Sequence, residues 1–273
     1  MKPKSFKKNF PKIGLALGSG AARGFCHIGV LKVLEANGIP IHCITGCSMG
    51  AIIGGGYAAG HSIAEMEQLA AGMTQHLIRD FGVGFHRQGM FKGERVMAVL
   101  EELLGEKKIE DCAIPFAAIA TEIRQNRLHT FKSGLLTEAM RASMSIPGVF
   151  TYAENSQGRF IDGGVLERIP VTAARELGAE FVIGVDALGP PDSKYYHESG
   201  GINGMLDMIE RAYLIIDWQA QKQRVTTEPD FLITPDQQGR SMYKFNDNVG
   251  AINDGIKAAI AALPEILRKF PNA

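Results

Sequence analysis

The chain has 273 residues, and its 29 basic and 29 acidic side chains cancel to a formal net charge of zero at pH 7. This balance argues against a general nucleic-acid-binding protein, which needs a strongly basic surface. Hydrophobic residues make up 45% of the chain, so the composition excludes an intrinsically disordered protein and suits one large α/β domain.

The first dozen residues are rich in lysine, with two phenylalanines among them. The lysines are Lys2, Lys4, Lys7, Lys8 and Lys12. We expect residues 1–11 to form a basic tail ahead of a single domain that spans residues 12–273. Such a tail either remains a solvated terminus or makes weak contact with an anionic membrane surface.

Two further features bear on where the protein works. The apolar stretch at 13–17 is shorter than the roughly seven residues that the core of a signal peptide needs. The cysteines, at positions 26, 43, 47 and 112, have neither C-x-x-C nor zinc-site spacing. Both features are typical of a cytoplasmic protein with reduced thiols, in contact with the inner membrane surface at most peripherally.

Strand-like and helix-like segments alternate along the chain. The first strand is predicted at Ile13–Leu17, and a second follows at 41–45. Ser62 and Glu65 form a capping box that starts a helix. The other predicted elements are helices at 25–36, 94–104, 171–177, 204–224 and 249–263, the last ended by Pro264, and strands at 114–120 and 181–185. This alternation predicts a mostly parallel sheet with helices on both faces.

Two segments fit neither pattern. Residues 82–93 are rich in Gly, Phe and Met, and residues 187–203 are rich in Gly, Pro, Ser and Tyr. Each segment is either a lid or channel wall over a site or an ordinary surface loop.

Residues 46–50 read GCSMG, between a strand-like and a helix-like segment. This G-x-S-x-G order predicts a nucleophile elbow, in which Gly46 and Gly50 allow a sharp turn and Ser48 stands at its tip. The following helix places its positive end beneath the serine. Cys47 is an alternative nucleophile by chemistry, but the tip of the elbow is the central serine, so we interpret Cys47 as a small packed residue.

The glycine-rich stretch 18–24, GSGAARG, follows the first strand and precedes a helix. Small residues there expose backbone N–H groups that can stabilise an oxyanion, and the candidates are Gly18, Ser19, Gly20 and Ala21. The competing interpretation is a dinucleotide-binding loop. That fingerprint requires glycine where Arg23 stands, so the oxyanion interpretation is favoured.

A serine nucleophile needs a base, and two are available. Asp162 follows an apolar strand and precedes Gly163 and Gly164, which suits a carboxylate at a strand end, although Asp-Gly is also an ordinary hairpin turn. His197 could complete a Ser-Asp-His triad in hydrolase order, but it lies in a polar stretch without a motif.

Taken together, these motifs resemble patatin-like phospholipases, in particular the bacterial branch similar to the catalytic domain of neuropathy target esterase. The resemblance extends over roughly 13–267 and includes a further motif, RASMSIPGVF, at 141–150. The residues that support the motifs are Arg23, Gly24, Gly46, Gly50, Gly163 and Gly164. The chain departs from the usual family pattern at Ser19 and Ala21, where many relatives carry Gly, and at Cys47, where Thr is common. It also departs at Glu167 and Arg168, where relatives often have Asn before a Pro pair.

The resemblance implies a three-layer α/β/α fold and hydrolysis of lipid or other acyl esters through an acyl-enzyme. It implies a dyad of Ser48 and Asp162, an oxyanion hole in the glycine loop, and no cofactor or metal. Two other functions remain as alternatives: a catalytically silent regulator with the same fold, and a nucleotide-binding oxidoreductase.

Overall fold

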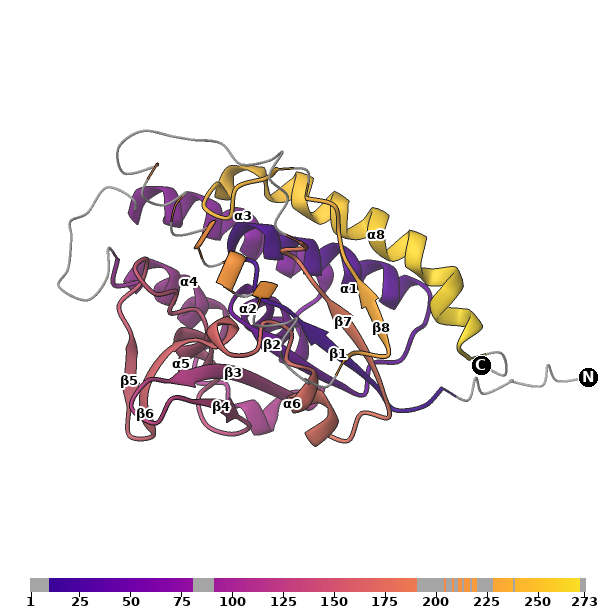
Figure 1. Cartoon of the computed structure of the whole chain (residues 1–273), viewed down its shortest axis with the longest axis horizontal. Helices are drawn as coiled ribbons and strands as arrows, with labels where there is room; N and C mark the ends of the chain where they lie inside the picture. Colours follow the sequence, from indigo (N-terminus) through magenta and orange to yellow (C-terminus); the bar gives the residue numbers. More distant parts are fainter. Residues whose placement is uncertain are drawn as a thin grey trace, which may run out of the picture.

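The computed structural model describes residues 10–80, 91–190, 228–237 and 239–270, with isolated positions between 204 and 219; for 74–80 it describes the backbone only. Within these ranges an eight-stranded sheet forms the centre of the molecule (Figure 1). Its strands are β1 (Ile13–Leu17), β2 (Cys43–Cys47), β3 (Phe116–Glu122), β4 (Arg127–Phe131), β5 (Ala153–Asn155), β6 (Gly158–Asp162), β7 (Phe181–Val185) and β8 (Phe231–Ile233).

The strand order is β5-β6-β3-β2-β1-β7-β8, with β4 paired to β3 beside this path. β1, β2, β3, β7 and β8 run parallel, whereas β4 and β6 run antiparallel to β3, and β5 runs antiparallel to β6. The sheet is therefore mixed but mostly parallel. The three antiparallel strands form a lobe at one end, of which the sequence patterns predicted only the strand before Asp162, β6.

Successive residues of a strand point to opposite faces of the sheet. Both faces carry buried apolar side chains here, and helices cover both. In β2, Ile44 packs into the larger core beneath α1 and α2, whereas Cys43 packs with α6 on the other face. α1 and α8 lie side by side over the larger core (Figure 1). The helices are α1 (Cys26–Ala36), α2 (Met49–Ala58), α3 (Ile63–Asp80), α4 (Glu94–Leu104), α5 (Leu136–Ser143), α6 (Val171–Glu176) and α8 (Asn248–Arg268).

The fold confirms the predicted three-layer α/β/α arrangement, and most predicted elements appear. The strands predicted at 41–45 and 114–120 lie two residues later, at β2 and β3. Besides β4 and β5 of the antiparallel lobe, α5 and β8 were not predicted. Of the helix predicted at 204–224 only isolated positions are described, and these are helical. Much of the 82–93 and 187–203 segments lies outside the described residues.

The predicted end of the last helix was wrong. α8 continues through Pro264 to Arg268. A proline inside a helix removes one N–H and crowds the carbonyl four residues earlier, here that of Ile260. The Ile260 side chain is exposed, so this carbonyl faces the solvent side of α8, where water can take the place of the lost donor.

The start of the described chain packs against its end. The ring of Phe10 lies 5.5 Å from that of Phe270, which also contacts Phe181 at 4.8 Å. The N–H of Lys12 donates to Glu180 at 3.0 Å. Residues 1–9 of the predicted basic tail lie outside the described residues.

Candidate active site

Ser48 lies at a strained turn between β2 and α2. Its φ of 55° is one of three positive values at non-glycine positions among the described residues. A Cβ on Gly46 would lie 2.5 Å from the N of Ala51, so only glycine fits there. Non-glycine residues in such conformations cost about 1–3 kcal/mol and concentrate at active sites. The predicted strand-turn-helix context of the elbow is therefore present.

Two glycines bring the elbow against the glycine loop. A Cβ on Gly50 would lie 2.2 Å from the carbonyl oxygen of Leu17, and a Cβ on Gly24 would lie 2.5 Å from the Cβ of Met49. Neither approach tolerates a side chain. The predicted supporting residues Gly24 and Gly50 thus allow close contact between the two motifs.

The N–H groups of the glycine loop differ in what they bind. The N–H of Gly18 donates to the carbonyl of Val185 at 3.0 Å, and that of Ser19 donates to the carbonyl of Arg168 at 3.0 Å. No hydrogen bond within the described part of the chain engages the N–H groups of Gly20 and Ala21. Of the four predicted oxyanion donors, the geometry thus leaves Gly20 and Ala21 available. Ala21 has a φ of 44°, a second strained residue in this site.

Asp162 ends β6 and is fully buried. Its Oδ1 accepts the N–H of Gly164 at 2.8 Å and the thiol of Cys47 at 3.6 Å. A Cβ on Gly163 would lie 2.6 Å from the carbonyl oxygen of Ile119, so this glycine lets the turn lie against β3. β6 continues into a 3-10 turn and not into a paired strand, so the hairpin interpretation of this Asp-Gly pair was wrong.

The ladders on β3 bring the elbow and Asp162 together. Cys47 lies opposite Ile119 in the β2 ladder, and Asp162 lies opposite Ala120 in the β6 ladder. β4 pairs with residues 118–122 of β3, a stretch that overlaps both the part paired with β2 and the part paired with β6. A strand has two edges, so β4 lies along one edge of β3, and β2 and β6 both lie along the other. Their carboxyl ends meet there at neighbouring positions. Ser48 directly follows Cys47, so the tip of the elbow lies next to Asp162.

The end of α5 contacts both residues. The hydroxyl oxygen of Ser143 accepts the N–H of Ser48 at 2.8 Å, and the carbonyl of Ser145 accepts the N–H of Asp162 at 2.9 Å. The guanidinium of Arg141 donates to the hydroxyl of Ser145 at 2.6 Å. The motif at 141–150 thus holds the backbone of Ser48 and of Asp162, a role that the sequence did not indicate.

His27 supports the glycine loop from below. It is fully buried, and its Nε2 lies 2.8 Å from the carbonyl oxygen of Gly18. Burial lowers its pKa to about 4, so the ring is neutral at pH 7. Since the carbonyl can only accept, Nε2 carries the proton. The sequence motifs did not indicate this hydrogen bond between His27 and the loop.

A buried ion pair supports the loop from the other side. Arg168 donates to Asp186 at 2.7 Å, and both side chains are almost fully buried. Asp186 also accepts the N–H groups of Leu188 and Gly189, both at 3.0 Å. The backbone carbonyl of Arg168, a departure from the usual family pattern, accepts the N–H of Ser19. The ion pair thus holds in place the residue that binds this side of the loop.

Other predicted features are placed as follows. Cys47 is fully buried, as expected for a packed residue. His197 lies outside the described residues. In the described part of the chain, no three His, Cys, Asp or Glu side chains converge as a metal site, and no helix has the length and hydropathy to span a membrane.

Comparison with known proteins identifies the family. The model of the patatin-like phospholipase family matches residues 15–175, which include the glycine loop, the elbow and Asp162. The chain belongs to the patatin-like phospholipase family. This confirms the resemblance of the motifs and removes the reason to consider an oxidoreductase.

Relatives of this patatin-like chain confirm the branch. An uncharacterized NTE family protein of Mycobacterium tuberculosis is 36% identical over 180 residues, 66% of this chain and 50% of that protein. Human patatin-like phospholipase domain-containing protein 6 is 34% identical over 180 residues, 64% of this chain and 13% of that protein. The chain thus spans about half the length of its mycobacterial relative.

A solved structure supports the fold. The crystal structure of VipD from Legionella pneumophila superposes with a TM-score of 0.55 over 93% of this chain and 67% of that chain, at 13% identity. At this identity the likeness concerns the fold alone. The three-layer arrangement is therefore shared between the two proteins.

Proposed function

We propose that the chain is a serine hydrolase of lipid or other acyl esters that uses Ser48 as nucleophile and Asp162 as base. The observation that carries the proposal is the meeting of β2 and β6 on one edge of β3, which brings the strained elbow next to a buried carboxylate. Membership of the patatin-like phospholipase family supports the same reaction class.

In the first half of the reaction, the carboxylate of Asp162 takes the proton of the Ser48 hydroxyl as the oxygen attacks the ester carbonyl carbon. The carbonyl oxygen becomes an oxyanion, which the N–H groups of Gly20 and Ala21 stabilise. When the carbon–oxygen bond to the alcohol breaks, Asp162 returns the proton to the leaving alkoxide. The acyl group is then bonded to Ser48.

In the second half, a water molecule takes the place of the alcohol. The water oxygen attacks the acyl carbon while Asp162 accepts one proton of the water. The N–H groups of Gly20 and Ala21 again stabilise the oxyanion. The bond to Ser48 breaks, the proton passes to the Ser48 oxygen, and the free acid leaves. The strained conformations of Ser48 and Ala21 keep the nucleophile and one donor in place before the substrate binds.

A lipophilic fluorophosphonate tests this proposal directly, because it bonds to an activated serine. Labelling should fall on Ser48, and the Ser48→Ala variant should remain unlabelled. A panel of esters with increasing acyl length, measured on the same two proteins, then defines the substrate class. A folded protein that is neither labelled nor active on any ester would favour the silent regulator.

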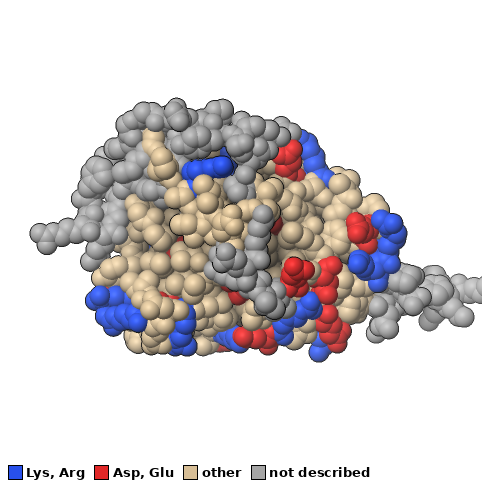
Figure 2. All heavy atoms as spheres, in the orientation of Figure 1, with Lys and Arg blue, Asp and Glu red and all other residues tan. Residues whose placement is uncertain are grey.

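We also propose that residues 1–9 of the predicted basic tail, which precede the packed Phe10, hold the domain weakly at anionic membranes, with no nucleic-acid partner. On the face shown in Figure 2, basic and acidic side chains lie interspersed along the lower rim and uncharged residues fill the middle, in keeping with the balanced composition. Each Lys near an anionic surface contributes about 1 kcal/mol, so binding should be weak and salt-sensitive. Cosedimentation with anionic vesicles, with and without residues 1–9, tests it.

A further inference from the structure

We propose that a short segment between β8 and α8 positions the oxyanion donors of the glycine loop, with Arg240 as its central positioning residue. We call Gln237 together with residues 239–242 the C-terminal clamp. The inference rests on the proposed function, since it assigns a role in stabilising the oxyanion. It adds a group of residues that lie more than two hundred positions from the loop in the sequence.

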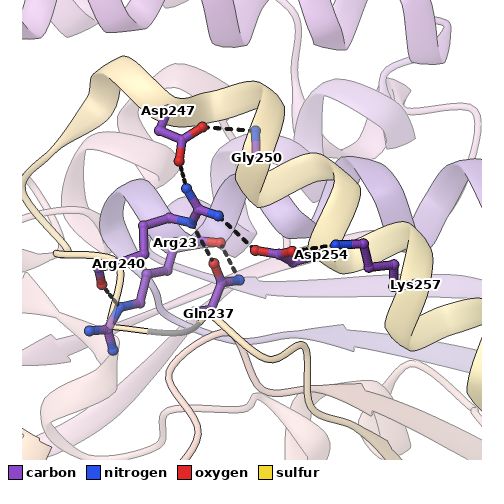
Figure 3. Close-up of polar contacts among 7 residues, drawn as sticks. All are labelled: Arg23, Gln237, Arg240, Asp247, Gly250, Asp254 and Lys257. Atoms are coloured by element: carbon purple, nitrogen blue, oxygen red, sulfur yellow. Dashed lines mark hydrogen bonds and ion pairs between the residues drawn. The ribbon is translucent and has the colours of Figure 1, made fainter. Parts of the chain in front are cut away.

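Three hydrogen bonds join the clamp to the loop, and Figure 3 draws the two that involve Arg23. The N–H of Ala22 donates to the carbonyl of Met242 at 2.9 Å. The Nε of Arg23 donates to the carbonyl of Arg240, and the side-chain amide of Gln237 donates to the carbonyl of Arg23 at 3.2 Å. The clamp thus contacts both residues that directly follow Ala21.

Arg240 holds the clamp in shape. Its guanidinium donates to Asp254 at 2.7 Å, to Asp247, and to the side-chain oxygen of Gln237 at 3.3 Å (Figure 3). The side chains of Arg240 and Asp254 are only 15% and 14% exposed. Asp247 is the N-cap of α8 and accepts the N–H of Gly250 at 3.0 Å, and Asp254 lies further along the same helix. A planar guanidinium that binds three acceptors fixes their relative positions.

The loop is therefore held on both sides of its donors. Gly18 and Ser19 bind the carbonyls of Val185 and Arg168, and Ala22 and Arg23 bind the clamp. Between these anchored pairs lie Gly20 and Ala21, the two residues whose N–H groups the proposed reaction uses. Ala21 has a positive φ, and such a conformation persists only where surrounding contacts over-determine it. Loosening one side should let Ala21 relax and move its N–H.

The Arg240→Met variant tests the clamp, because it removes the charge and the three contacts but keeps a long side chain. A displacement of about 1 Å in a catalytic group costs on the order of 100-fold in rate. We expect kcat on a chromogenic acyl ester to fall about 10- to 100-fold, with KM changed less than about threefold, since the donors act mainly on the oxyanion. Asp254→Asn, which keeps one acceptor oxygen, should give a smaller loss in kcat.

A pair of inhibitors separates positioning from general damage. A long-chain trifluoromethyl ketone forms a hemiketal in which Ser48 bonds to the ketone carbon, its proton passes to Asp162, and the ketone oxygen becomes an oxyanion. The matching unfluorinated ketone stays trigonal. In Arg240→Met, affinity for the trifluoromethyl ketone should fall in proportion to kcat/KM, and affinity for the plain ketone should change less than about threefold.

Two control variants match the lost charge. Arg175→Met removes a half-buried arginine bound to Asp230 at 2.5 Å, at the opposite end of β7 from the loop. Lys257→Met removes an exposed cation that contacts Asp254 at 3.4 Å but does not touch the clamp. Both should keep wild-type kcat. A folded Arg240→Met enzyme with wild-type kcat and inhibitor affinity would overturn the inference, and so would an equal loss of kcat in Arg175→Met.

Failure of the inference can be told from failure of the proposed function. If Ser48→Ala is inactive and unlabelled while Arg240→Met turns over normally, the reaction stands and the clamp has no role. If Ser48→Ala retains full activity, the nucleophile is wrong and the clamp inference falls with it. Should Arg240→Met not fold, Asp254→Asn with the same two inhibitors decides the outcome by the same criteria.

Discussion

The elbow and the glycine loop meet at one site, yet they are held in different ways. The elbow is shaped mainly by five consecutive residues, because Gly46 and Gly50 leave room for the turn that strains Ser48. The glycine loop is held by distant partners on both sides. The distant partners are Arg168, Val185, Gln237, Arg240 and Met242, and His27 adds a hydrogen bond from the adjacent helix α1.

This difference bears on how each region tolerates change. A turn that depends on its own residues is lost when one of them is replaced. A loop held by distant partners can be weakened gradually by replacing those partners one at a time. Variants in the elbow should therefore act on the chemistry in large steps. Variants around the glycine loop should act in graded steps on rate or stability.

The largest effect is expected for Ser48→Ala. Removing a serine nucleophile typically leaves a rate only about 10³–10⁴ above that in water, so turnover should fall by several orders of magnitude. Alanine keeps the strained φ, so the free energy of unfolding should stay close to wild type. Ser48→Gly should be inactive as well but more stable, by about 1 kcal/mol, because glycine adopts this φ without strain. Urea denaturation of both variants, beside ester turnover, checks the two parts.

Asp162→Asn should come next. It keeps the shape of the base and an oxygen for the N–H of Gly164 but removes the proton acceptor. We expect near-complete loss of turnover and near-wild-type rates for His197→Ala. The reverse pattern in steady-state assays would point to a triad and against the dyad.

Much of this site could be predicted from the sequence because its chemistry lies in short motifs. Local pattern is enough to predict strand β1, which the structure confirms, and to select Ser48 as the candidate nucleophile. For Asp162 the pattern left two interpretations open, because Asp-Gly is also an ordinary hairpin turn. The pairing of Asp162 with Ser48 came from family resemblance. In the structure it depends on which edge of β3 receives β6, and spacing along the chain carries no information about that.

The supports of the loop escaped prediction for a different reason. Arg168 and Arg240 act through one backbone carbonyl each and through buried ion pairs, and neither role restricts the neighbouring residues to a pattern. The end of the last helix was predicted wrongly at Pro264, because local propensity carries no information on which side of the helix faces water. β4 and β5 of the antiparallel lobe were missed because these strands are short and half-exposed.

Arg168→Met tests the loop's support from the side opposite the clamp. The substitution leaves the Asp186 carboxylate buried without its cation, and breaking such a pair typically costs about 3–5 kcal/mol. We expect the free energy of unfolding to fall by this amount and kcat to fall less than in the elbow variants. The double variant with Asp186→Leu should recover much of the stability, which urea denaturation would show. A single variant as stable as wild type would mean that the pair does not hold this region.

The smallest effect concerns pH and His27. Burial lowers the pKa of His27 to about 4 from its ordinary 6.5, so the folded protein binds fewer protons than the unfolded chain between these two values. Stability contributed by the neutral ring is fully present above pH 6.5 and is lost as the pH falls toward 4. The loss over this window is about 3 kcal/mol at most, because a tenfold difference in proton affinity corresponds to about 1.4 kcal/mol.

His27→Gln removes the titration while keeping a donor that can reach the carbonyl of Gly18. At pH 7 the variant should be somewhat less stable than wild type, because the amide fills the buried space less well. Between pH 6.5 and 4.5 its stability should fall less steeply, so the two curves should converge. Equal slopes for both proteins in urea denaturation would show that the ring does not titrate on unfolding. Convergence would show that the folded protein depends on a neutral ring beneath the glycine loop.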